Sequence, residues 1–191
     1  GCEAPCRAAC RLNEIPGGQS VDIPAVERAA MRHGAARTGR GLLKFKKKKT
    51  AAVFGAELFT LIVAGELAAK SYPTKFFVAE GSAEELMDKC APFLSPEDRA
   101  AEIKGLAAMD IELEYGSELT PELVRGAGAD IVCVSREVLA LLDKSAAPDE
   151  VTLWCESLGV LARAGENGGV ISAFYDARRA GVSAARLAQD M

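Results

Sequence analysis

Three cysteines with even spacing near the start of the chain carry its clearest chemical signal. They are Cys2, Cys6 and Cys10, each separated from the next by three residues. Half of the six cysteines in the chain therefore fall within its first ten residues. Thiols gathered this closely are typical of a metal centre or of a disulfide knot.

Composition favours the metal centre over the disulfide knot. The opening residues lack the charged stub and apolar stretch of a secretory signal. No apolar run approaches the roughly 18 residues of a membrane span, and the most apolar helix candidate, 58–69, is interrupted by Glu66. We therefore expect a cytoplasmic protein without membrane insertion, in which thiols stay reduced and bind metal.

Among metal centres, an iron–sulfur cluster fits these cysteines best. Cysteine thiolates are the usual ligands of such clusters, four to a cluster, whereas a zinc ribbon needs two Cys-x-x-Cys pairs. We predict Cys2, Cys6 and Cys10 as metal ligands, with [4Fe–4S] as the expected cluster. A fourth ligand remains to be found, and a structural chain whose cysteines hold zinc or nothing stays as an alternative.

The other candidate ligands have weaker support. Cys133 lies in a buried-strand candidate, where cysteine usually acts as a small apolar residue. Cys90 ends a predicted helix, and Cys155 lies in a segment without clear pattern. His33, the single histidine, lies in a Gly- and Arg-rich turn and is expected to face solvent.

Charge and length limit the possible partners and the organisation. The 191 residues carry a net charge of −4, which does not suggest a nucleic-acid partner. The basic run formed by Lys44 and 46–49 is interpreted as a solvated linker. We divide the chain into a cysteine-rich iron–sulfur segment, 1–40, and an α/β domain, 41–191.

Strands and helices alternate from residue 50 onward. Strands are expected at 50–54, 75–79, 110–115, 129–134 and 169–174. Helices are expected at 57–70, 83–90, 96–108, 120–126 and 182–189, and one more, 24–32, in the cysteine-rich segment. This alternation predicts an α/β fold: a small helical N-terminal segment, then a Rossmann-like, mostly parallel sheet with helices on both faces.

The first strand–helix junction resembles a dinucleotide site that has lost its key residues. Such sites need Gly-x-Gly-x-x-Gly so that the pyrophosphate can approach bare backbone. Only Gly55 remains, and Glu57 places a carboxylate where the pyrophosphate would lie. Val78 stands where the second strand should place an acid for the ribose, and Glu80 lies two residues further on. A bound dinucleotide is therefore not expected.

The order of these segments resembles one family, the iron–sulfur flavoproteins of the glutamate synthase small subunit and the N-terminal half of dihydropyrimidine dehydrogenase. Its members carry an iron–sulfur domain, then an FAD domain with an inserted NAD(P)H domain. The run Cys2-Glu-Ala-Pro-Cys6-Arg-Ala-Ala-Cys10 resembles the family's second cysteine motif. Weaker similarities follow in the same order at 21–28, 47–56, 71–77, 94–99, 109–113 and 168–179.

Several departures imply a shortened member with degraded FAD motifs. Glu84 and Glu85 stand where the family has a glycine pair, and Tyr175 stands where it has a glycine before the retained Asp176. The stretch 134–168 is too short for an NAD(P)H domain. FAD is therefore not expected. In the family a Gln or Glu on the following helix can complete a cluster, which makes Glu27 a candidate fourth ligand.

The resemblance implies a role inside a larger redox complex. The family's first cysteine motif would precede Gly1, so another subunit is the expected source of missing ligands. We expect a non-catalytic electron-transfer and scaffold subunit that carries an iron–sulfur cluster and binds larger redox subunits. The alternative is a compact FAD-dependent oxidoreductase subunit, for which Gly55 and Asp176 are the retained signals.

Overall fold

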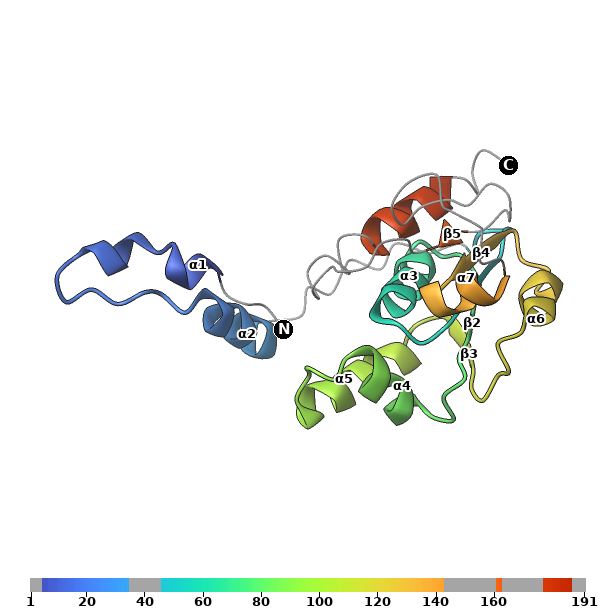
Figure 1. Ribbon diagram of the computed structural model, residues 1–191, viewed down its shortest axis with the longest axis horizontal. Coiled ribbons are helices and arrows are strands. Elements are labelled where there is room, and N and C mark those ends of the chain that lie inside the picture. Colours follow the sequence, from blue (N-terminus) through green and yellow to red (C-terminus); the bar gives the residue numbers. More distant parts are fainter. Residues whose placement is uncertain (1–4, 35–45, 143–160, 163–176, 187–191) are drawn as a thin grey trace. The chain divides into compact units, whose positions relative to one another are not determined.

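The computed structural model describes residues 5–34, 46–142, 161–162 and 177–186. The chain separates into two compact units, residues 1–44 and 45–191. Figure 1 shows the elements of each unit. The roles predicted for the segments 1–40 and 41–191 stay predictions.

Residues 5–34, the described part of the N-terminal unit, contain three short helical segments. They are α1 (Pro5–Ala8), a 3-10 helix η1 (Arg11–Glu14) and α2 (Ile23–His33). α2 begins where the sequence predicts, because Asp22 accepts a hydrogen bond from the backbone N–H of Ala25 at 3.1 Å. α1 and η1 were not predicted, since four residues are too few to show a helical period.

The second unit is built on an all-parallel sheet. Its strands are β1 (Ala51–Phe54), β2 (Thr74–Phe77), β3 (Ile111–Glu114), β4 (Ile131–Val134) and the two-residue β5 (Leu161–Ala162). The spatial order is β3-β2-β1-β4-β5, and every neighbouring pair is parallel. The predicted Rossmann-like α/β fold is thus confirmed.

Helices connect these strands and begin at recognisable caps. They are α3 (Leu58–Ala69), α4 (Ala83–Cys90), α5 (Pro96–Ala107), α6 (Pro121–Gly126) and α7 (Arg136–Leu142), and residues 177–186 are also helical. The side chains of Ser82, Ser95 and Thr120 each accept a hydrogen bond from a backbone N–H three residues on. These hydroxyls explain why helices start where the sequence predicts.

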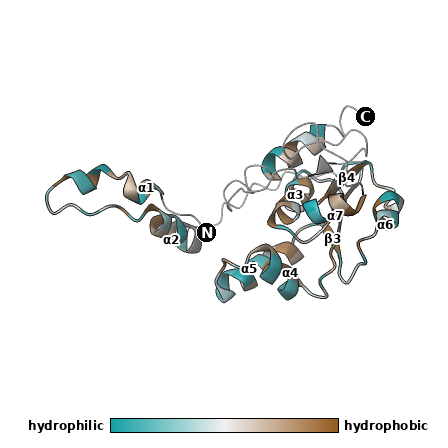
Figure 2. Ribbon diagram, in the orientation of Figure 1, coloured by the Kyte–Doolittle hydropathy of each residue, from teal (hydrophilic) through white to brown (hydrophobic). Residues whose placement is uncertain are grey.

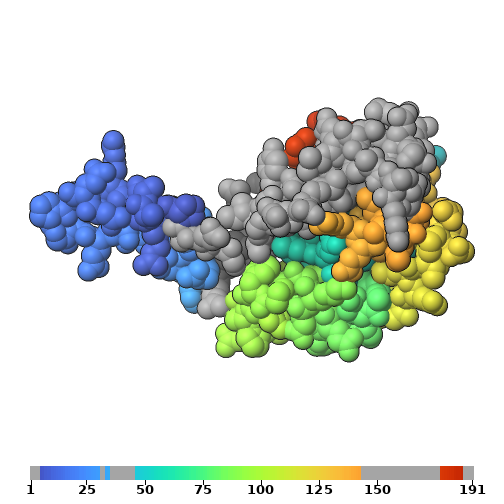
Figure 3. Space-filling view, in the orientation of Figure 1, coloured from blue at the N-terminus to red at the C-terminus, as the bar shows by residue number. Residues whose placement is uncertain are grey.

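The two faces of the sheet carry separate apolar clusters. On one face, Val53 and Phe76 pack against α3 and helix 177–186. On the other, Phe54 and Val134 pack against α6 and α7, which lie next to each other on the surface, yellow and orange in Figure 3. Helices therefore cover both faces, as predicted, and all four residues of β1 are buried.

α3 is apolar around most of its circumference because it has partners on two sides (Figure 2). Besides the sheet, it meets helix 177–186, where Gly181 lies so close that an added Cβ would come within 2.8 Å of Glu66 Cβ. Glu66 forms ion pairs with Lys70 at 2.7 Å and Arg178 at 3.2 Å. No helix within the described residues is long and apolar enough to cross a membrane.

Several predicted boundaries differ from the structure. Each of the strands β1 to β4 is one or two residues shorter than predicted, because only residues that pair with a neighbour count as strand. β2 also begins one residue earlier than predicted. α7 and β5 were not predicted. The last helix begins earlier than the predicted residue 182, because residues 177–181 are already helical, and the predicted residues 187–189 lie outside the described part of the chain. The predicted strand 169–174 lies outside the described residues.

Removing a large side chain from the sheet core should strongly destabilise this unit. Phe76 is completely buried between strands and α3, so Phe76→Ala leaves a cavity and should lower the free energy of unfolding by about 3–5 kcal/mol. Leu141→Ala is the control, since 59% of Leu141 is exposed and its loss should change little. Chemical denaturation measures both, and equal effects would contradict the assigned core.

Candidate functional site

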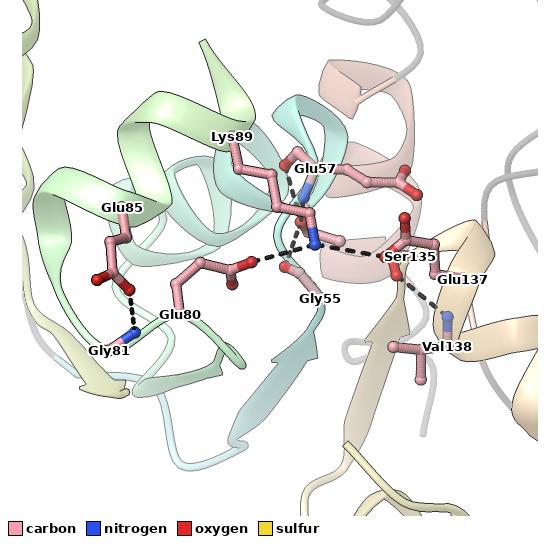
Figure 4. A network of polar contacts seen from close by, with 10 residues as sticks. Gly55, Glu57, Glu80, Gly81, Glu85, Lys89, Ser135, Glu137 and Val138 are labelled. Atoms are coloured by element: carbon pink, nitrogen blue, oxygen red, sulfur yellow. Dashed lines mark hydrogen bonds and ion pairs between the residues drawn. The ribbon is translucent and has the colours of Figure 1, made fainter. Parts of the chain in front are cut away.

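The sheet order defines one position where parallel sheets usually bind ligands. β1 lies between β2 and β4, and the helices that follow β1 and β4 lie on opposite faces. Ligands of open α/β sheets bind at the carboxyl ends of strands where the connections diverge in this way. The candidate site is therefore the carboxyl edge formed by the residues that follow β1, β2 and β4 (Figure 4).

Gly55, directly after β1, faces Ser135, directly after β4. Gly55 has φ +106°, a conformation that residues with a side chain rarely adopt. An added Cβ would lie 2.2 Å from Ser135 Oγ and 2.5 Å from Ser135 Cβ. Ser135 is fully buried, and its Oγ accepts a hydrogen bond from Val138 N–H at 3.2 Å at the start of α7. The space that glycine leaves open is thus taken by the chain's own serine.

Glu57 is the N-cap residue of α3, the helix whose N-terminus would face the pyrophosphate in a dinucleotide site. Its carboxylate accepts from the backbone N–H of Thr60, and the Thr60 hydroxyl accepts from Glu57 N–H at 3.1 Å. The Thr60 hydroxyl also donates to a carbonyl oxygen, with Gly55 O at 2.7 Å and Glu57 O at 2.8 Å. The helix end that would attract a phosphate already has an anionic partner.

Lys89 of α4 links the segment after β2 to α7. Its ammonium lies 3.1 Å from Glu80 Oε1 and 3.5 Å from Glu137 Oε2 (Figure 4). Burial lowers the pKa of Lys89, but the hydrogen bonds and charges of Glu80 and Glu137 outweigh it and raise the pKa above the ordinary value. Glu80 is 12% exposed, and its Oε2 is buried without a hydrogen-bond partner among the described residues.

The acidic pair at the start of α4 also serves the fold. Ser82 Oγ accepts from Glu85 N–H at 3.2 Å, and Glu85 Oε2 accepts from Gly81 N–H at 2.8 Å. This reciprocal arrangement satisfies two backbone donors at the helix start. Glu84 lies in the same first turn, where acidic residues are favourable. A carboxylate pair therefore stands where the resemblance expects glycines.

Two of the three predicted metal ligands lie in the N-terminal unit on one short turn. Cys6 belongs to α1 and Cys10 caps η1, and both are free, partly exposed thiols. Hydrogen bonds from Ala9 N–H to Pro5 O at 3.1 Å and from Cys10 N–H to Arg7 O at 3.4 Å close the turn between them. Cys2 lies outside the described residues. Glu27 is exposed on α2 of the same unit.

No three of the described His, Cys, Asp and Glu residues gather closely enough to hold a metal. A metal site built on Cys6 and Cys10 would need Cys2, which lies outside the described residues, and a further ligand. His33 is exposed at the end of α2. The predicted ligand set Cys2, Cys6 and Cys10 therefore stays a prediction.

Cys90 and Cys133 belong to the apolar core of the α/β unit. Burial, followed by the negative charge of Glu80, raises the pKa of Cys90 to about 12. Burial raises the pKa of Cys133 to about 12 as well. Both thiols are 4% exposed or less, and Cys155 lies outside the described residues. Thiols in this state are inert packing groups.

Sequence reasoning missed Ser135, Lys89 and Glu137. Ser135 comes directly after a buried strand and three residues before the N–H that it caps, which is a recognisable helix-start signal. The bridge made by Lys89 has no such signal, because its two partners come from segments far apart in sequence.

Comparison with known proteins gives only a distant likeness. No protein-family model and no curated protein matches the chain. Among solved structures, histamine dehydrogenase from Rhizobium sp. 4-9 is similar over 51% of this chain and 16% of its own, with 20% identity and a TM-score of 0.38. The 6-hydroxypseudooxynicotine amine oxidase of Pseudomonas geniculata N1 is similar over 56% and 17%, with 18% identity and a TM-score of 0.36.

This chain therefore spans only about a sixth of the length of the solved proteins it resembles. The fold class is therefore assigned from the sheet itself. This unit is an α/β unit with a Rossmann-like parallel sheet, in the order β3-β2-β1-β4-β5.

The close approach of Gly55 to Ser135 should make position 55 intolerant of any side chain. Gly55→Ala should cost about 2–4 kcal/mol of unfolding free energy, since it adds a clash and an unfavourable φ. Gly105→Ala, inside α5 with nothing within 4 Å of the added Cβ, should instead be neutral or stabilise by up to about 1 kcal/mol.

A double-mutant cycle isolates the contact. Ser135→Gly removes the atoms that the new Cβ meets, so the pair Gly55→Ala/Ser135→Gly should lose less stability than the sum of the single changes. Strict additivity in urea denaturation would show that the two residues do not touch.

The cysteines should separate into two reactivity classes. In the metal-free native chain at pH 8, iodoacetamide should label the accessible Cys6 and Cys10, whereas Cys90 and Cys133, with pKa values of about 12, should stay unmodified. Peptide mass spectrometry with and without denaturant measures this. Rapid native labelling of Cys133 would contradict its place in the core.

Proposed function

We propose that this chain is a non-catalytic electron-transfer and scaffold subunit, which binds an iron–sulfur cluster through Cys2, Cys6 and Cys10 within a larger redox complex. One observation carries the proposal: the carboxyl edge where a dinucleotide would bind is filled by the chain's own side chains, while accessible thiols remain in the N-terminal unit. A filled dinucleotide position argues against flavin- or nicotinamide-dependent catalysis by this chain. The thiols offer ligands for a metal cluster instead.

Three features of the carboxyl edge support the loss of nucleotide binding. Ser135 takes the space beside Gly55, Glu57 caps α3, and Lys89 is shared between two carboxylates. A pyrophosphate placed there would meet the charge of Glu57 in a partly buried position, where repulsion between like charges is strong. The α/β unit then serves as a docking body for the partner subunits.

The described part of the cysteine turn fits a metal–thiolate site. Cys6 and Cys10 are partly exposed, free of disulfides and four residues apart in sequence, on one turn that backbone hydrogen bonds close. Arg7 directly follows Cys6 and Arg11 directly follows Cys10, and positive charges near an anionic cluster are favourable. A bound cluster would exchange single electrons, with Cys2 as third ligand and Glu27 or another chain as fourth.

The alternative function is a compact FAD-dependent oxidoreductase subunit. Its support is the Rossmann-like topology together with Gly55 at a positive φ directly after β1. Ser135 accounts for that glycine without a ligand, so we favour the first proposal. Asp176, the other residue behind this alternative, lies outside the described residues.

Metal analysis tests the proposed function directly. The full chain, purified anaerobically and reconstituted with iron and sulfide, should hold both and show charge-transfer absorption in the visible range. Cys6→Ser and Cys10→Ser should each reduce bound iron by at least about tenfold, whereas Cys90→Ala, a change at a buried core thiol, should leave it unchanged.

The same preparation separates the alternatives. Zinc in place of iron would support a structural role for the cysteines. Flavin released on denaturation would support the FAD-dependent subunit. A chain that holds neither iron nor sulfide, alone or with its partner subunits, would overturn the proposal.

A further inference from the structure

The described part of the N-terminal unit has almost no apolar packing of its own. Among residues 5–30, 33 and 34, none is buried, and Leu12, Ile15 and Val26 are 40–59% exposed. Its longest helix, α2, has 11 residues, which is marginal for an isolated helix in water. Polar contacts must therefore define the path of the chain around the cysteines.

Asn13 makes two hydrogen bonds to the turn that carries Cys6 and Cys10, and this pair of bonds is called the Asn13 clasp. Its side-chain Nδ2 donates to the carbonyl oxygen of Arg7 at 2.9 Å, and its backbone N–H donates to the carbonyl oxygen of Cys10 at 3.0 Å. Arg7 lies directly after Cys6, so the two bonds hold the backbone beside both cysteines. The Arg7 carbonyl also accepts from Cys10 N–H at 3.4 Å.

A second contact ties the same turn to α2. The Arg7 guanidinium lies 3.6 Å from Asp22 Oδ2, while Asp22 Oδ1 accepts from Ala25 N–H at 3.1 Å. Asp22 therefore caps α2 and pairs with the cysteine turn through different oxygens. Both side chains are about half exposed, so this ion pair is a weaker constraint than the Asn13 clasp.

We infer that Asn13 is a positioning residue of the metal site, which fixes the separation and orientation of Cys6 and Cys10, and that the Arg7–Asp22 pair assists it. The inference rests on the proposed function. Ligands held in place by hydrogen bonds bind metal more tightly than ligands on a free loop, because less ordering is needed on binding.

The experiment compares Asn13→Ala with Glu14→Ala in the full chain. Glu14 is the neighbouring exposed residue of η1, so its substitution changes the same helix without touching the clasp. Iron and sulfide content, the rate of iron release to a chelator, and the EPR spectrum of the reduced cluster are measured. Asn13→Ala should release iron about fivefold faster, the effect of one lost hydrogen bond, with an altered spectrum.

A second pair of variants separates the ion pair from the helix cap. Asp22→Asn keeps an oxygen that can accept from Ala25 N–H but removes the charge that pairs with Arg7. It should accelerate iron release by less than Asn13→Ala does. Hydrogen exchange at the Cys10 and Asn13 amides of the metal-free chain should also be faster in Asn13→Ala than in Glu14→Ala.

The outcomes are distinguishable. Iron bound by the unsubstituted chain, with unchanged release, spectrum and amide exchange in Asn13→Ala, overturns the inference and leaves the proposed function standing. No iron or sulfide in the unsubstituted chain overturns both. Faster release in Asn13→Ala and Glu14→Ala alike indicates a general loss of structure and also overturns the role of Asn13.

Discussion

The approach of Gly55 to Ser135 is the contact on which the α/β unit depends. It joins the ends of the two central strands, β1 and β4, where the chain leaves the sheet toward opposite faces. Gly55 must lack a side chain for two reasons, its φ of +106° and the serine 2.2 Å from where a Cβ would be. The serine in turn caps α7, so the residue that fills the space beside Gly55 also sets the start of that helix.

Most charged and hydrogen-bonding groups at this carboxyl edge find their partners within the chain itself. Glu57 supplies the anion at the N-terminus of α3, and Lys89 lies between Glu80 and Glu137. In a nucleotide-binding sheet the same positions leave backbone donors free for phosphate and place an acid for the ribose. Here most of those donors and charges have partners within the chain, with Glu80 Oε2 as an exception among the described residues, so the parallel sheet keeps its architecture while its usual phosphate-binding groups are engaged.

The N-terminal unit is held together by different interactions from those of the α/β unit. The α/β unit buries three fully enclosed phenylalanines, whereas none of the N-terminal residues with placed side chains is buried. Its order comes from polar contacts, the Asp22 cap, the Arg7–Asp22 pair and the Asn13 clasp, which surround two accessible thiols. A metal–thiolate bond is strong enough to stabilise so small a unit, which links the proposed cluster to the fold of the segment that would hold it.

The sequence by itself determined the class of fold and most helix starts. Strand–helix alternation and caps such as Ser82 and Thr120 are local signals, and local physics produces them. It also singled out Gly55 as the one retained glycine of a dinucleotide-site pattern, and Glu57 as the carboxylate that departs from that pattern. Only the tertiary structure decided that Ser135 fills the space beside Gly55, that Lys89 bridges two distant glutamates, and that Asn13 clasps the cysteine turn. The contacts of Ser135 and Lys89 depend on which strands become neighbours in the sheet. The contact of Asn13 depends on a side chain that reaches back six residues. None of these contacts produces a periodic pattern in the sequence.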